Sequence, residues 1–226
     1  MTDHATTVEM TRQAIRTPRA AAVAGIVFSV LLTTILVLVR LAVRGDPTTV
    51  EEWTEGGGRD LFVVALNLLP FAGIAFLWFI GVIRDRIGAG EDRFFATVFL
   101  GSGLLFVAML FTCGAVAGGL VLSSRDATGQ PPGELWAFGR RVTTTLLNVY
   151  AMRMAAVFTI STTTLATRLG LVPRWLAVMG LATGLVLLTL AGWLPWFEII
   201  FPAWVFVLSM HILLATLRSP SEHRAA

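Results

Sequence analysis

Six long apolar stretches constrain the fold of this chain more than any other feature of its sequence. Each is close to or longer than the ~20 residues that an α-helix needs to cross a bilayer. Because lipid offers no hydrogen-bond partners to an exposed backbone, such stretches are expected to be α-helical. The sequence therefore predicts an all-α, polytopic transmembrane bundle of about six spans. The stretches cover approximately residues 20–39, 61–83, 94–122, 142–166, 175–193 and 196–217.

The charge content agrees with a membrane protein. Only 14% of the 226 residues are charged, whereas soluble domains carry roughly 25%. All the basic residues are arginines, and they are dispersed at the ends of the apolar stretches instead of forming a basic stripe, so nucleic-acid binding is not expected. Cys113 is the single cysteine, which excludes an intrachain disulfide.

The predicted domain organisation is one transmembrane domain, residues 20–217, between two short cytoplasmic tails, 1–19 and 218–226. Both tails are too short to fold alone and are expected to be mobile. The first apolar stretch is longer than the 7–15 residues of a signal-peptide core, so we interpret it as a retained anchor. The two longest loops, about 40–60 and 123–141, are predicted on the outer side.

The arginine distribution predicts that both termini lie in the cytoplasm, because basic residues favour the inner side of a membrane. Ten arginines fall in the inner segments of this topology and six in the outer loops. A chain that contains arginine but no lysine and is rich in alanine and glycine is typical of a GC-rich bacterium. The expected location is therefore the bacterial plasma membrane. The inner set is Arg12, Arg16, Arg19, Arg84, Arg86, Arg93, Arg168, Arg174, Arg218 and Arg224, and the outer set is Arg40, Arg44, Arg59, Arg125, Arg140 and Arg141.

Local motifs predict features at the loops and between helices. Asp46, Pro47 and Trp53 fit a short interfacial helix in the first outer loop. Small-residue patterns, Gly114-x-x-x-Gly118 and Gly180-x-x-x-Gly184, are expected to bring helices close together within one bundle. Tryptophan side chains are expected to anchor the bundle at the membrane surfaces, at the outer one for Trp53, Trp136, Trp193 and Trp196 and at the inner one for Trp175.

Three ionisable side chains fall within predicted spans, at a cost of ~2.5–3.5 kcal/mol or more each at mid-depth. Arg153 lies about three helical turns below Arg141 along its helix, close to the bilayer midplane. Glu198 is the only carboxylate predicted within a span. We hypothesise that Arg153 and Glu198 form a buried ion pair, or share a water molecule or an anionic ligand group.

Other polar residues complete a candidate intramembrane binding cluster with Arg153 and Glu198. Tyr150 lies three residues from Arg153 and on the same helical face. Asn67 and Asn148 lie at similar depth, although Asn148 points about 140° away from Arg153 around the helix. One pocket lined by all five residues is therefore not required by the pattern.

His211 is a secondary candidate in the inner half of the last apolar stretch. A lone imidazole there is more often an interhelical hydrogen-bonding group than a ligand. Motifs for nucleotide binding, zinc proteolysis and serine nucleophiles are not found in the sequence. No catalytic residue, metal site or cofactor is predicted.

The chain resembles uncharacterised six-helix membrane proteins of GC-rich bacteria. The resemblance is carried by residues 69–79, 84–86, 91–95, 148–154 and 173–175 and spans most of the chain. It implies the fold and carries no activity over.

Three functional hypotheses remain open. The first is a non-enzymatic accessory or binding component whose partners are the lipid bilayer and either a second copy or another membrane protein. The second is a small oligomeric transporter or channel for an anionic or polar solute, using the Arg153 region. The third is a lipid-modifying enzyme that uses Glu198 with Tyr150 and Arg153.

Overall fold

The computed structural model describes residues 3–43, 58–87, 93–123, 133–190 and 196–218. Every regular element in these ranges is helical. The π-helix η1 joins α5 to α6, and the 3₁₀ turn η2 leads into α8, so the described residues form six rods. The elements are α1 Asp3–Ala42, α3 Gly58–Ile87, α4 Arg93–Ser123, α5 Gly133–Thr145, η1 Leu146–Ala151, α6 Met152–Arg168, α7 Arg174–Thr189, η2 Phe197–Ile199 and α8 Ile200–Arg218.

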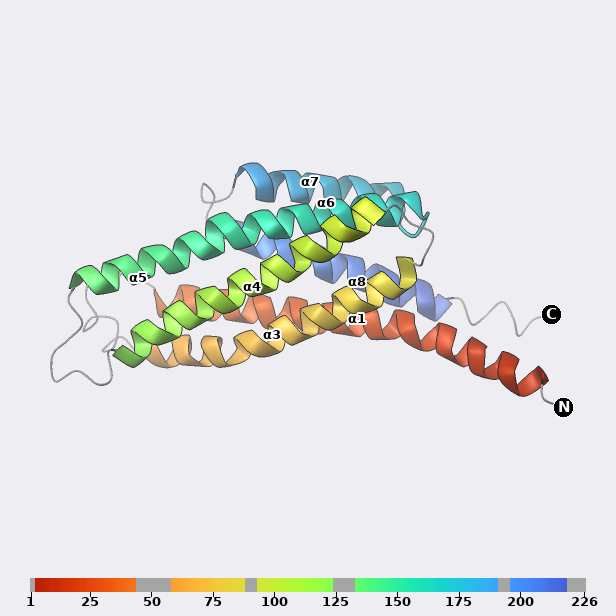
Figure 1. Ribbon diagram of the computed structural model, residues 1–226, viewed down its shortest axis with the longest axis horizontal. Helices are drawn as coiled ribbons and strands as arrows, with labels where there is room; N and C mark the ends of the chain where they lie inside the picture. Colours follow the sequence, from red (N-terminus) through yellow and green to blue (C-terminus); the bar gives the residue numbers. More distant parts are fainter. Residues whose placement is uncertain (1–2, 44–57, 88–92, 124–132, 191–195, 219–226) are drawn as a thin grey trace.

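The six rods run alternately in opposite directions along one bundle (Figure 1). As a result, the start of α1 and the end of α8 lie at the same end, together with the end of α3. We call this the Arg84 end. The opposite end, which we call the Arg40 end, collects the end of α1, the start of α3, the end of α4 and the start of α5.

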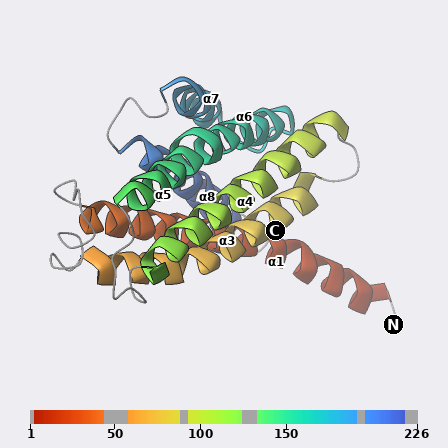
Figure 2. The same cartoon turned by 60° about the vertical axis from the view of Figure 1, so that its left-hand side comes forward.

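Helix packing follows a simple neighbour pattern. Helix α1 packs mainly against α3 and α8, and α6 packs against α7 and α4. Helix α7 lies on the outside of the bundle, against α6 and α8. The first part of α1 projects beyond the other helices (Figure 2).

The centre of the bundle is filled by phenylalanine. Among the side chains that the structure describes, seven phenylalanines from five helices are at most 1% exposed. Phe76 on α3 stands at the middle of this aromatic core, with ring centroids 4.5 Å from Phe28 and 5.0 Å from Phe158. The aromatic core therefore ties α1, α3, α4, α6 and α8 together. Its members are Phe28, Phe76, Phe79, Phe99, Phe106, Phe158 and Phe201.

The glycine patterns pack helices within this one bundle, as predicted. A Cβ added at Gly184 on α7 would meet the side chain of Ile160 and, at 3.3 Å, the carbonyl oxygen of Ala156, both on α6. A Cβ at Gly114 on α4 would meet Leu69 on α3. In lipid, burying apolar side chains between helices gains little free energy, and small residues stabilise the bundle by letting the helix backbones approach closely.

Among the described residues, four helices are long and apolar enough to cross a membrane. They contain Ala20–Ala42, Gly58–Arg84, Ala96–Leu122 and Phe197–Leu217. These coincide with four of the six predicted spans. Helix α7 is apolar but only 16 residues long, and the α5–η1–α6 rod is more polar, so the two remaining spans stay predictions.

Two helices extend beyond the segments predicted for them. Residues 3–19, predicted as part of a mobile cytoplasmic tail, continue α1 as helix. The predicted outer loop 123–141 is helical from Gly133 onward, so the fourth rod starts nine residues earlier than the apolar pattern indicated. Both extensions have the same physical cause. Adding residues to an existing helix avoids the free-energy cost of nucleating a new one, so the polar flanking residues continue the helix. The predicted interfacial helix near Asp46 lies outside the described residues.

Candidate functional site

Glu198 forms an ion pair with Arg40, not with Arg153. One terminal nitrogen of Arg40, Nη2, donates to both carboxylate oxygens of Glu198, at 3.1 Å and 3.2 Å. The Glu198 side chain is 7% exposed, whereas that of Arg40 is 40% exposed. The predicted Arg153–Glu198 pair is therefore wrong, and the pair that exists joins the end of α1 to the start of α8.

Trp196 completes this cluster at the Arg40 end. The Arg40 guanidinium carbon lies 5.2 Å from the centre of the indole ring, within cation–π range. Trp196 has a left-handed backbone, with φ of 68°, directly before η2. Such a conformation is costly for a residue with a side chain and persists only where its surroundings hold it. The contacts with Arg40 provide part of that support.

Arg153 uses the backbone of its own helix as an acceptor. Its Nη1 donates to the carbonyl oxygen of Val149, at 3.1 Å. Val149 lies in η1, where hydrogen bonds run from residue i to i−5, as from the Met152 N–H to Leu147 O. Single-turn π-helices disturb the regular backbone pattern and are frequent at functional sites. The guanidinium thus caps a segment whose geometry the apolar pattern did not predict.

The remaining members of the predicted cluster lie apart from one another. Asn148 also lies in η1, and its Oδ1 is buried without a hydrogen-bond partner. Tyr150 is exposed on the bundle surface. Asn67 is exposed on α3, where its side chain donates to Val63 O at 2.9 Å. Within the described residues, no hydrogen bond or ion pair joins any two of the five cluster residues.

His211 packs against an aromatic ring. Its imidazole and the Trp175 indole are perpendicular, with ring centres 6.4 Å apart. This contact joins α8 to α7 near the Arg84 end. Among the described residues, no three His, Cys, Asp or Glu side chains gather as metal ligands would.

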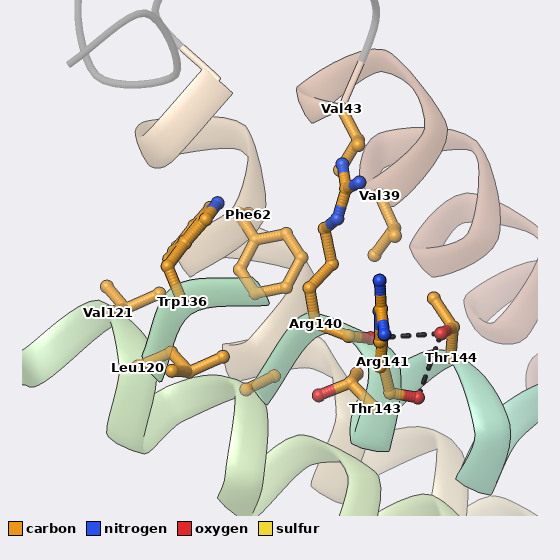
Figure 3. Close-up of a pocket in the computed structure, with 11 residues that line it drawn as sticks. Val39, Val43, Phe62, Leu120, Val121, Trp136, Arg140, Arg141, Thr143 and Thr144 are labelled. Atoms are coloured by element: carbon orange, nitrogen blue, oxygen red, sulfur yellow. Dashed lines mark hydrogen bonds between the residues drawn. The ribbon is translucent and has the colours of Figure 1, made fainter. Parts of the chain in front are cut away.

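Four helices enclose a pocket of about 380 Å³ at the Arg40 end (Figure 3). We call it the α5 pocket. Its walls are mainly apolar and come from four helices, with Val39 on α1, Phe62 on α3 and Leu120 on α4. Arg140 and Arg141 on α5 also line it. In Figure 3 the Arg140 side chain runs between Phe62 and Val39 toward the end of α1.

Helix α5 is positioned over α4 by a small residue and an aromatic one. A Cβ added at Gly139 would meet the Leu120 side chain at 2.5 Å, so the two helices touch closely there. Trp136 is 8% exposed and packs with Val121 and Phe62. Its indole therefore lines the pocket and packs within the bundle, and its predicted position at the membrane surface stays a prediction.

The sequence of α5 contains a helical pattern that indicates the α5 pocket, although most of this segment was predicted as a loop. Trp136, Gly139 and Thr143 recur at i, i+3 and i+7, the spacing of one helical face. Cys113 on α4 lies behind this face, with its Sγ 3.5 Å from Thr143 O. Reading residues 133–145 as helix would have placed both arginines beside the ends of the neighbouring spans.

No protein-family model, curated protein or solved structure matches this chain. The resemblance to six-helix bacterial membrane proteins therefore stays a prediction.

Proposed function

We propose that this chain is a multi-pass protein of the bacterial plasma membrane that acts as a non-enzymatic binding or accessory component. The observation that carries the proposal is the aromatic core. Seven phenylalanine rings occupy the middle of the bundle with at most 1% exposure. A bundle whose centre is filled with aromatic rings is better suited to binding a ligand or partner at its edges than to conducting a solute through its middle.

The proposed topology has six passes with both ends of the chain in the cytoplasm. Four passes are the candidate spans. Helix α7 and the α5–η1–α6 rod supply the other two. At ~24 Å, α7 is shorter than the ~30 Å hydrocarbon core, and local thinning of the bilayer would accommodate it. The alternating directions of the rods and the arginine excess at the Arg84 end support this arrangement.

Cysteine labelling in intact cells tests the orientation. In a Cys113→Ala background, a single cysteine replaces either Arg141 at the Arg40 end or Leu169 at the Arg84 end, both of which are exposed. A membrane-impermeant maleimide is expected to label the cysteine at 141 in intact cells and the one at 169 only after lysis. The reverse pattern would invert the topology, and labelling of both in intact cells would break the six-pass count.

Solute flux tests the non-conducting centre against the transporter hypothesis. Liposomes containing the purified protein are expected to take up radiolabelled sulfate, phosphate and glutamate no faster than protein-free liposomes, because phenylalanine rings fill the centre of the described bundle. The Arg153→Gln variant should be indistinguishable. Transport would replace the proposed function if two results were found together. The uptake would have to exceed the protein-free rate several-fold, and it would have to fall in Arg153→Gln but not in the control Arg84→Gln.

A further inference from the structure

We infer that the α5 pocket binds an anionic phospholipid, with an acyl chain against its apolar walls and the phosphate at Arg140 and Arg141. This inference rests on the proposed binding function and names its ligand class. At about 380 Å³, the cavity falls within the 300–1,000 Å³ typical of small-molecule sites.

The pocket lies at the depth where a phospholipid changes from chain to headgroup. Val39, Phe62 and Leu120 each lie within about one helical turn of the end of a candidate span. These three side chains belong to three different helices, so the pocket opens where three spans leave the apolar layer together. An acyl chain that entered there would remain in hydrocarbon while its headgroup stayed at the surface.

The arginines supply the charge that favours an anionic headgroup. Arg140 and Arg141 follow the apolar residues of α5 and both line the pocket. The guanidinium group presents a planar set of donors that fits phosphate oxygens in a bidentate manner. Arg141 is exposed, and its side chain has no hydrogen-bond or ion-pair partner among the described residues. Basic pockets between transmembrane helices bind anionic lipid headgroups on the matrix or cytoplasmic side of membranes, and the same pairing of guanidinium with phosphate applies at this pocket.

The apolar walls are built to receive a chain. Phe62 and Trp136 present aromatic faces, and Val39 and Leu120 present branched aliphatic side chains. Filling such a cavity restores dispersion contacts that an empty space lacks. A phosphate without a chain would leave these walls unused, and a zwitterionic lipid would not match the two adjacent positive charges. An anionic phospholipid satisfies both parts of the pocket.

Fluorescence quenching of Trp136 by brominated lipids tests the inference. The full-length protein is reconstituted in phosphatidylcholine vesicles that contain brominated-chain phosphatidylglycerol or, separately, brominated-chain phosphatidylcholine. The Trp136 contribution is the difference between the wild type and Trp136→Phe, and this indole is shielded from bulk lipid at 8% exposure. We expect brominated phosphatidylglycerol to quench this contribution at mole fractions where brominated phosphatidylcholine does not.

Charge variants identify the headgroup contact. Arg140→Gln with Arg141→Gln should weaken the apparent affinity for phosphatidylglycerol ~10-fold or more, as expected for two interfacial arginines. The matched control, Arg84→Gln with Arg174→Gln, removes the same charge at the Arg84 end and should leave quenching unchanged. Equal quenching by both lipids would reduce the site to ordinary lipid contact and overturn the inference.

A second measurement guards against misfolding of Trp136→Phe. Added phosphatidylglycerol should raise the Tm of the wild-type protein in detergent more than added phosphatidylcholine does, because a ligand of the folded state stabilises it. The difference should vanish in Arg140→Gln with Arg141→Gln and persist in the control variant. No quenching and no lipid-specific Tm shift would overturn the inference. Concentration-dependent self-association in place of both would identify a second copy of the chain as the occupant. Neither result depends on the flux experiment, so the ligand and the proposed function can fail separately.

Discussion

Replacing Phe76 by alanine is expected to lower the free energy of unfolding by about 3 kcal/mol. The ring is fully buried and its centroid lies within 6.1 Å of five other phenylalanine rings. Inside a lipid-embedded bundle, dispersion contacts between well-packed side chains contribute more than the transfer of apolar surface does. Truncation would therefore open a cavity among α1, α3, α4, α6 and α8 that none of these helices can close alone.

The effect should be measured as a loss of thermal or denaturant stability in detergent micelles. The matched control is Phe71→Ala, on the same helix, where the ring is 62% exposed. That change should stay within ~0.5 kcal/mol of the wild type, as is usual for surface substitutions. Equal losses for the two variants would show that the aromatic core does not hold the bundle together.

The regular part of the fold could be predicted because it follows from local physics. An apolar run near the thickness of a bilayer has few alternatives to a helix, and the runs near 20–39, 61–83, 94–122 and 196–217 all fall in candidate spans. Where helices stop is a different question. Residues 3–19 and 133–141 are polar enough to read as tail and loop, yet each adjoins a helix that extends through it.

The candidate site was harder to predict because it depends on contacts distant in sequence. The depths of Arg153 and Glu198 along their helices were compatible with an ion pair, but depth does not determine which helices are neighbours. Helix α1 packs against α8, and this places Arg40 beside Glu198, 158 residues away. Arg153 then finds an acceptor within its own helix, where η1 departs from α-helical geometry.

A second large effect is expected at the Arg40–Glu198 ion pair. Arg40→Gln should cost about 1–3 kcal/mol, less than a fully buried pair because Arg40 is partly in solvent. The cost arises because the carboxylate of Glu198, 7% exposed, would lose its only hydrogen-bonded partner among the described residues. Glu198→Gln should cost less, since the amide oxygen still accepts a hydrogen bond from Arg40.

The double variant decides whether these two effects belong to one interaction. Arg40→Gln combined with Glu198→Gln should be more stable than Arg40→Gln alone, because no uncompensated buried charge remains. Unfolding in detergent gives the coupling free energy through a double-mutant cycle. A parallel cycle between Arg153→Gln and Glu198→Gln should be additive, since Arg153 bonds to Val149 O. Coupling to Arg153 together with additivity to Arg40 would reverse this assignment and restore the Arg153–Glu198 pair. Coupling to Arg40 alone would make Glu198 the residue that fixes the start of α8 against the end of α1.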